Sequence, residues 1–157
     1  YRAFCDKELE AVIGARRIEQ VNFSRTSLVG TVRGMHFQHP PHAELKLVRC
    51  LRGRVWDVAV DLRAGSATYL QWFAVELTPV NRLMMVIPEG CAHGFQVLES
   101  DSELLYLHTA RYTPVAEGGI RHDDPTLNIK WPLSVTEVST RDRSHQNIQS
   151  TFSGLLI

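Results

Sequence analysis

The sequence has no surplus of charge of either sign. Its 157 residues contain 17 Lys and Arg against 17 Asp and Glu, so the net charge is zero when the histidines are neutral. Proteins that bind nucleic acid or anionic membrane surfaces through a broad electrostatic field carry a basic excess. We therefore expect neither nucleic acid nor a membrane among the partners of this protein.

Long apolar runs are also missing. No stretch approaches the roughly 18 apolar residues of a membrane span, and the first residues, YRAFCDKELE, lack the basic and then apolar order of a signal peptide. We expect a soluble, cytoplasmic protein. Because the chain begins with Tyr1 rather than Met, we also expect further residues upstream.

Cysteine is scarce. Cys5, Cys50 and Cys91 are an odd number at wide spacings, which fits neither a disulfide framework nor a zinc knuckle. We expect buried free thiols in a reducing compartment. The length is that of one compact domain and excludes a two-domain enzyme with its own cofactor-binding lobe, so we expect a single domain over residues 1–157.

One segment near the N-terminus has a helical pattern. Leu9, Val12 and Ile13 recur at helical spacing, Asp6 is placed to cap the helix, and Gly14 is placed to end it. We expect a short helix there.

From Leu45 onward the pattern changes to short runs of β-forming residues, each bounded by Gly, Pro, Asn, Asp or Ser. The runs are LKLVRCL (45–51), RVWDVAVDL (54–62), TYLQWFAVEL (68–77), RLMMVI (82–87), FQVL (95–98) and ELLYLHT (103–109). Many short strands with frequent turns predict an all-β barrel or sandwich.

Polar residues alternate with apolar ones along these runs. Asp57 and Asp61 fall on the face opposite Trp56, Val58, Val60 and Leu62, which is the period of a strand. Lys46 lies between two leucines, and Tyr106 and His108 interrupt another leucine run. Polar groups that point into a barrel are either satisfied core residues or the lining of a pocket.

The end of the chain has no clear period. Residues 121–133 have turn chemistry, and residues 141–157 are polar until the final apolar residues. There is no repeat, linker or low-complexity tract. We expect a loose C-terminal tail.

Three of the seven histidines crowd into MHFQHPPHAELK, as His36, His39 and His42, with Glu44 close behind. Together with His93 in PEGCAHGF they offer the nitrogen and oxygen ligands of an iron, manganese or zinc centre. A closely spaced His-x-His pair is lacking, and a lysine follows Glu44 two residues later. A metal-dependent cupin enzyme is therefore the alternative interpretation.

The preferred interpretation is acid–base chemistry without a metal. Such chemistry needs a base that works near neutral pH, an acid on the opposite face of the substrate, and a positive group where negative charge develops. His36, Tyr106 and Lys46 have the right side chains for these three roles.

The order of motifs along the chain adds more than any single residue. The strings QVNFSRTSLVGTVRGMHFQ, KLVRCLRGRVWDVAVDLRAGS, IPEGCAHGFQVL, LLYLHTARYTP and GGIRHDDPTLNIKWPL follow one another along the chain. In this order, and at close to the family's spacing, they resemble the dTDP-4-dehydrorhamnose 3,5-epimerase family, from about Arg2 to Asp142.

The resemblance implies a cupin-like, double-stranded β-helix (jelly-roll) barrel with a short N-terminal helix and a C-terminal tail. It implies a homodimer that binds a dTDP-linked 4-keto-6-deoxyhexose and uses no metal or organic cofactor. The implied reaction inverts carbons 3 and 5 by removing a proton next to the ketone and returning one to the opposite face.

The resemblance also assigns the catalytic residues. It makes His36 of RGMHFQ the general base, Tyr106 of LLYL the proton donor and Lys46 of KLVR the group that stabilises the enolate. It pairs Asp142 of STRDRS with the base, where a carboxylate orients the imidazole and favours its protonated form.

The substrate-binding positions come from the same resemblance. Guanidinium groups suit a diphosphate because they form paired, charge-assisted bonds to phosphate oxygens. The implied contacts are Arg2, Gln20, Val21, Asn22, Arg33, Lys46, His93, Glu117 and Arg141. His39 and His42 match no catalytic position, and we expect them on an exposed loop.

The sequence departs from the family in several places. Leu107 stands where a Lys commonly follows the catalytic Tyr, and Arg111 stands where a Tyr is usual near the sugar. The stretch SRTSLVGTVRG is one residue longer than usual, and the family's N-terminal strand would lie upstream of residue 1. The change at Arg111 makes a mono-epimerase the second alternative, and a non-catalytic sugar-binding barrel is the third.

Overall fold

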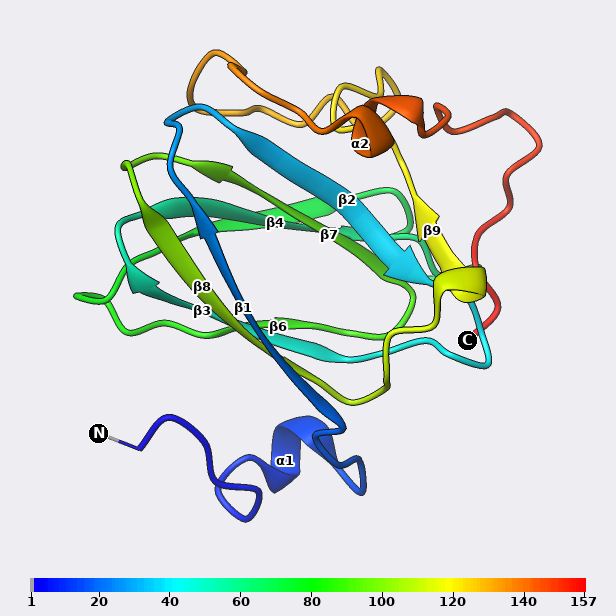
Figure 1. Ribbon diagram of the computed structural model, residues 1–157. Helices are drawn as coiled ribbons and strands as arrows, with labels where there is room; N and C mark the ends of the chain where they lie inside the picture. The colour runs from blue at the N-terminus through cyan, green and yellow to red at the C-terminus, as the bar shows by residue number, and fades with distance from the viewer. Residues whose placement is uncertain (1) are drawn as a thin grey trace.

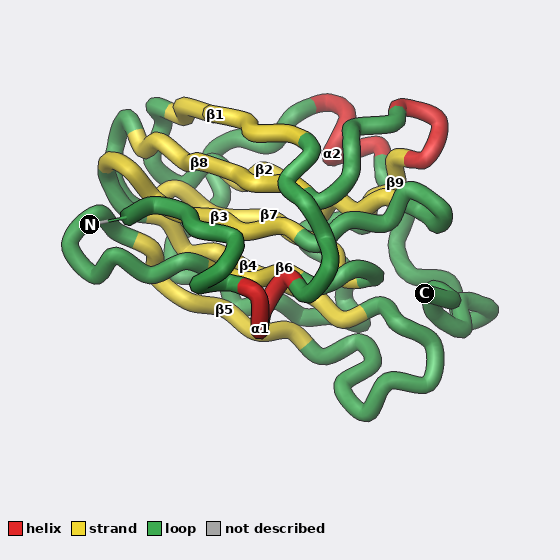
Figure 2. The backbone as a smooth tube through the Cα atoms, turned by 90° about the horizontal axis from the view of Figure 1, so that it is seen from below, coloured by secondary structure: helices red, strands yellow, loops and turns green. Residues whose placement is uncertain are grey.

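The computed structural model describes residues 2–157, and nearly all of its regular structure is β-strand. Two antiparallel sheets face each other, as Figures 1 and 2 show from two directions. One sheet has the order β1 (Gln20–Thr26), β8 (Ser102–His108), β3 (Lys46–Arg52), β6 (Met85–Ile87). The other has the order β5 (Trp72–Leu77), β4 (Val55–Asp61), β7 (Cys91–Val97), β2 (Val32–Gln38), β9 (Glu117–Gly119). The predicted all-β jelly roll is confirmed.

Each predicted run from Leu45 onward overlaps a strand, although β7 begins four residues before its run, and three strands were not predicted from periodicity. These are β1, β2 and β9. β1 is an edge strand whose residues are mostly exposed, so its sequence carries little apolar alternation. In β2 the pairing with β7 shifts register between Arg33 and His36, which interrupts a period of two.

The polar face of β4 points between the sheets. Val55 belongs to an apolar cluster that joins both sheets, and Asp57 and Asp61 share its face of the strand. Val58 and Val60 lie on the other face, outside the barrel, and are completely buried by later parts of the chain. The predicted alternation is thus confirmed. The carboxylates can face into the barrel because the valines on the other face of β4 are covered by later parts of the chain.

The C-terminal segment is packed rather than loose, so that expectation was wrong. Ile148, Phe152 and Leu155 pack on the outer apolar face of the five-stranded sheet. The Leu155 N–H donates to the Leu62 carbonyl at 2.7 Å. The exposed valine face of β4 would be costly in water, and burying it holds the segment in place.

Two short α-helices and a 3₁₀ turn complete the described chain: α1 (Glu10–Ile13), α2 (Thr140–Ser144) and η1 (Pro114–Ala116). Gly14 ends α1 with a φ of +60°, as predicted. Asp6 does not cap it, because the helix starts four residues later and the Asp6 carboxylate accepts the Lys7 N–H instead.

Helix α1 covers the outer face of the four-stranded sheet. Ile13 is buried against Leu45, Leu47 and Leu107. The leucines beside Lys46 and Tyr106 therefore point outward, and the polar residues between them point into the barrel.

Cys50 and Cys91 are buried free thiols, as expected, and burial raises the pKa of each to about 11. Cys5 is only partly buried, so the expectation was wrong for this residue. Within residues 2–157, no helix has the length and apolarity required to cross a bilayer.

Asp61 holds the loop that follows β4. Its carboxylate accepts hydrogen bonds from the Arg63 backbone and guanidinium, at 2.7–2.9 Å, and from Ser66 and Thr68 at 2.5 and 2.6 Å. The bonds from Arg63 and the two hydroxyls outweigh the effect of burial and hold the pKa of Asp61 far below its usual value.

Asp61→Asn should lower the free energy of unfolding by about 2–3 kcal/mol at pH 7 without lowering turnover. The pKa of Asp61 is lower in the folded protein than in the unfolded chain, where it is about 3.9. The carboxylate therefore stabilises the fold fully above about pH 3.9, and this stabilisation is lost as the pH falls below that value. Urea unfolding from pH 8 to pH 3 measures this, with Asp123→Asn, in an exposed pair with Arg121, as control. Equal losses for the two variants would contradict the role of Asp61.

Candidate active site

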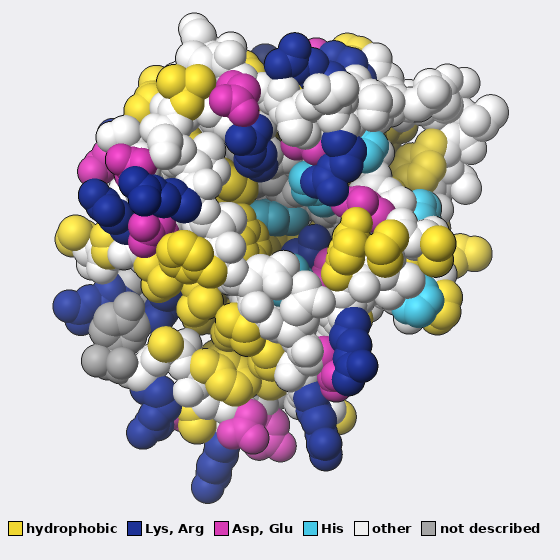
Figure 3. Space-filling view, viewed as in Figure 1, with side chains coloured by type: hydrophobic (Ala, Val, Ile, Leu, Met, Phe, Trp, Pro, Cys, Tyr) yellow, Lys and Arg dark blue, Asp and Glu magenta, His cyan; other side chains and the backbone are white. Residues whose placement is uncertain are grey.

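The two sheets enclose a pocket of about 570 Å³. In the space-filling view it is a hollow with histidine side chains inside and Lys or Arg side chains close by (Figure 3). One wall comes from β1, β8 and β3, and the other from β2 and β7. The lining residues are Val21, Asn22, Phe23, Ser24, Arg25, Thr26, Arg33, His36, Lys46, His93, Phe95, Tyr106, His108 and Arg141.

Two glycines let β2 and β7 approach closely at the pocket. A Cβ atom on Gly34 would lie 2.6 Å from Gly94 Cα, and one on Gly94 would lie 2.7 Å from the Arg33 carbonyl oxygen. Gly34 also has a φ of +117°, which favours glycine. Beyond this contact His36 pairs with His93 across the strands. The glycines of RGMH and AHGF thus bring two imidazoles to one wall.

His36 is held by a buried carboxylate. Its Nε2 lies 2.7 Å from Asp142 Oδ1, and the Gly34 N–H donates to the other carboxylate oxygen at 3.1 Å. Asp142 is 1% exposed. It sits in the first turn of α2, where its own N–H donates to the N-cap residue Ser139.

This arrangement fixes the tautomer of the histidine. Because Asp142 accepts the Nε2 hydrogen, the lone pair of a neutral His36 is on Nδ1, where it can take a proton. Burial alone would raise the pKa of Asp142, but the hydrogen bond and positive charge of His36, with the Gly34 N–H, lower it below the usual value. Asp142 is therefore ionised at neutral pH.

A second histidine–carboxylate pair lies deeper in the pocket. His93 Nε2 is 2.8 Å from Asp57 Oδ1, and Asp57 is fully buried. The His93 ring meets Tyr106 edge-on, with 6.1 Å between centroids. The sequence indicated His93, but only the inward face of β4 could have pointed to Asp57.

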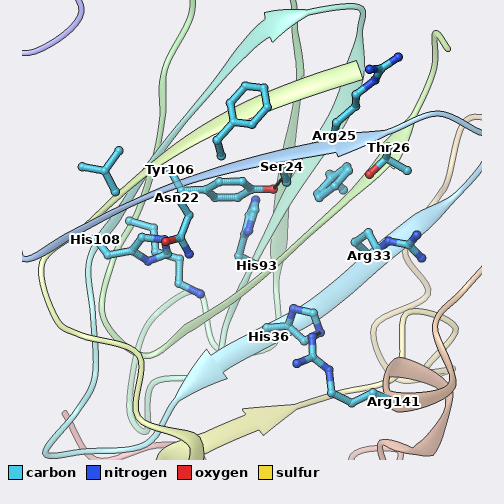
Figure 4. Close-up of a pocket in the computed structure, with 14 residues that line it drawn as sticks. Asn22, Ser24, Arg25, Thr26, Arg33, His36, His93, Tyr106, His108 and Arg141 are labelled. Carbon is cyan, nitrogen blue, oxygen red and sulfur yellow. Dashed lines mark hydrogen bonds between the residues drawn. The ribbon is translucent and has the colours of Figure 1, made fainter. Parts of the chain in front are cut away.

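Tyr106 stands on the wall opposite His36 (Figure 4). Its hydroxyl lies 3.2 Å from the Ser24 hydroxyl of β1. Burial raises the pKa of Tyr106 well above its usual value, and the Ser24 hydrogen bond offsets this only in part. The phenol is therefore neutral and able to donate a proton.

Lys46 adds a buried positive charge to the same wall as Tyr106. It is 7% exposed, and its Nζ lies 3.1 Å from Glu44. Glu44 also accepts a hydrogen bond from His108, at 2.6 Å.

Two of the predicted arginines line the pocket. Arg33 pairs with Glu137 at 3.0 Å, and its Nη1 is buried without a hydrogen-bond partner in the described chain. Arg141 pairs with Glu117 at 2.9 Å. Its Nη2 is 3.3 Å from His36 Nε2, so Arg141 places a positive charge beside this imidazole.

The remaining predicted binding residues lie at different distances from the pocket. Gln20, Asn22 and Glu117 line a smaller side pocket of about 190 Å³ that adjoins the main one. Val21 lies at the rim, with its residue 57% exposed. Arg2 is exposed, pairs with Glu8 and does not line either pocket of its own chain.

Leu107 and Arg111, the two substitutions among the departures from the family, do not line the pocket. Leu107 faces the cluster under α1, away from the pocket. The Arg111 side chain is 81% exposed and reaches Glu19 at 3.5 Å. Tyr112, the next residue, lines the side pocket and donates to Glu117 at 2.9 Å.

The ligand set expected for a metal-dependent cupin is not assembled. His39 and His42 are exposed on the loop after β2, as expected, while Glu44 and His93 are bonded to other side chains. Within residues 2–157, the His, Cys, Asp and Glu side chains close enough to hold an ion are His36, Asp142 and His145. Two of these three already form the histidine–carboxylate pair.

Comparison with known proteins identifies the family of this chain. The sequence profile described as dTDP-4-dehydrorhamnose 3,5-epimerase matches residues 1–150. The chain belongs to the dTDP-4-dehydrorhamnose 3,5-epimerase family. A family member from Sinorhizobium fredii is 45% identical over 127 residues, which are 81% of this chain and 65% of that protein. The match thus spans slightly less than two thirds of that relative.

Solved structures of the family share the fold. A dTDP-6-deoxy-D-glucose-3,5-epimerase from Legionella pneumophila, in complex with dTDP-4-keto-L-rhamnose, superposes with a TM-score of 0.91 at 38% identity. The superposition covers 100% of this chain and 85% of that one.

A further relative is similar in sequence. A dTDP-4-dehydrorhamnose 3-epimerase from Streptomyces niveus is 41% identical, over 88% of this chain and 66% of its own length.

Several pocket residues were not predicted as site residues. They include Ser24, Arg25 and His108, which line the pockets, and Asp57, which bonds His93 from behind. The signal for Asp57 and His108 was present, because both are polar residues at inward positions of a strand. Ser24 and Arg25 lie on β1, which periodicity did not reveal.

Proposed function

We propose that this protein inverts carbons 3 and 5 of dTDP-4-keto-6-deoxy-D-glucose and so forms dTDP-4-keto-L-rhamnose. Family membership supports this proposal, as does the product bound to the Legionella relative. The observation that carries it is the placement of a base and an acid on opposite walls of one pocket. Inversion at carbon requires a proton to leave one face and another to arrive at the other.

The described residues account for each step. Nδ1 of His36 takes the hydrogen from the carbon next to the ketone, and the electron pair of the C–H bond moves to form an enolate. The ammonium group of Lys46 stabilises the negative charge that develops on the ketone oxygen. Tyr106 gives its hydroxyl proton to the opposite face of the same carbon, which restores the ketone.

The other residues of the pocket would bind the nucleotide sugar. Arg33 has an unsatisfied buried donor and Arg141 lies at the mouth, and both suit the oxygens of a diphosphate. Gln20, Asn22 and Glu117 would contact the rest of the ligand, together with Val21, His93 and Arg2 as the resemblance implies. We further propose that the protein acts as a cytoplasmic homodimer.

The product of the reaction tests the proposal. The purified protein is incubated with dTDP-4-keto-6-deoxy-D-glucose, and the configuration at carbons 3 and 5 is read by NMR. We expect the L-rhamno product, at the same rate after treatment with a chelator. Inversion at carbon 3 alone would make the protein a mono-epimerase. A rate that falls with chelation and returns with a transition metal would instead support the metal-dependent alternative.

A further inference from the structure

Glu44, Lys46 and His108 form a buried polar cluster that the proposed chemistry uses only in part. Lys46 pairs with His108 across β3 and β8, and Gln20 pairs with His108 across β8 and β1. The three side chains at these positions point into the barrel, because all three line its pockets. The cluster therefore belongs to the wall that carries Tyr106.

Glu44 fixes both of its partners. One carboxylate oxygen accepts the Nδ1 hydrogen of His108 at 2.6 Å, and the other lies 3.1 Å from Lys46 Nζ. Burial raises the pKa of Glu44, but the His108 hydrogen bond and the Lys46 charge together lower it below its usual value. Glu44 is thus a carboxylate, and its bond to Nδ1 leaves Nε2 of His108 facing elsewhere.

That second nitrogen has no partner in residues 2–157. His108 Nε2 is buried and makes no hydrogen bond there, and the whole residue is only 9% exposed. Leaving a buried polar atom unpaired destabilises the fold, so such an atom in a residue that lines a pocket points to a ligand. His108 lines both the main pocket and the side pocket, and its ring stacks on Tyr106 at 6.0 Å (Figure 4).

We propose that His108 Nε2 accepts a hydrogen bond from a hydroxyl group of the hexose ring, and that Glu44 is the residue that positions His108 and Lys46. This inference rests on the proposed function, which puts the reacting carbons between His36 and Tyr106. A ring at that place reaches the junction of the two pockets. With Nδ1 donating to Glu44, Nε2 is the ring nitrogen left to accept a hydrogen bond, which a sugar hydroxyl can donate.

His108→Asn tests the contact, because the Asn amide can still donate to Glu44 but has nothing at the position of Nε2. We expect dTDP-L-rhamnose to bind about tenfold more weakly and dTDP to bind as before. Isothermal calorimetry measures both, with the exposed His42→Asn as matched control. Unchanged binding of dTDP-L-rhamnose, or equal weakening of both ligands, would overturn the proposal.

Steady-state kinetics separate the two roles. His108→Asn should raise KM with little change in kcat, because a contact made equally in ground and transition states affects binding alone. Glu44→Gln removes the charge that holds Lys46, so kcat should fall as well. Identical changes in the two variants would contradict a positioning role for Glu44. An inactive wild type would refute the proposed function, whereas an active wild type with an unchanged His108→Asn variant would refute this inference alone.

Discussion

His36→Gln lowers turnover by about 10²–10⁴-fold, the usual contribution of a general base. The Gln amide can donate to Asp142 as His36 Nε2 does, so the buried carboxylate keeps a partner. What the variant loses is the basic lone pair at Nδ1. The measurement is kcat with dTDP-4-keto-6-deoxy-D-glucose, together with exchange of substrate hydrogens into D₂O, and both should fall.

The control for this variant is His39→Gln, which alters an exposed histidine on the loop that follows β2. Its turnover should match that of the wild type, and both variants should unfold at wild-type temperatures. A His36→Gln enzyme within a few-fold of wild type would show that another residue removes the proton.

Tyr106→Phe separates removal of the proton from its return. The ring keeps its packing against the apolar cluster between the sheets, and only the hydroxyl that Ser24 contacts is lost. We expect product formation to fall by about 10²-fold or more, since general-acid catalysis contributes 10²–10⁴-fold. His36 remains intact, so hydrogens of the unreacted substrate should still exchange with D₂O. NMR of the recovered substrate and product measures both rates in one sample.

Tyr69→Phe is the matched control. Its hydroxyl donates to the Phe152 carbonyl at 2.9 Å, and the residue lines neither the main pocket nor the side pocket. Its turnover should change little. Parallel loss of exchange and product formation in Tyr106→Phe would contradict a role confined to proton return.

Much of the fold could be predicted from local patterns. The strands from Leu45 onward are short, contain β-branched residues and are separated by turn residues, so the local sequence predicts them. β1 could not be found in this way, because an exposed edge strand has no apolar face to leave a period of two. The end of the chain was misjudged for the opposite reason. Ile148, Phe152 and Leu155 are isolated apolar residues, and only the outer face of β4 gives them a place to pack.

The site was predictable by residue type and not by pairing. His36, Lys46 and Tyr106 are the right groups for acid–base chemistry, but Asp142 lies 106 residues from His36 and was indicated by the family resemblance alone. The pairs His93–Asp57 and His108–Glu44 likewise join residues far apart in sequence. Such pairs depend on strand register across the barrel, which one sequence does not display.

The most direct test of the account is position-resolved deuterium incorporation by the wild-type protein. Incubation with dTDP-4-keto-6-deoxy-D-glucose in D₂O, followed by NMR of the product, reports which carbons exchanged a proton with the site. We expect one deuterium at carbon 3 and one at carbon 5, each with inverted configuration. Inverted product without deuterium at either carbon, or no product at all, would contradict the proposed function.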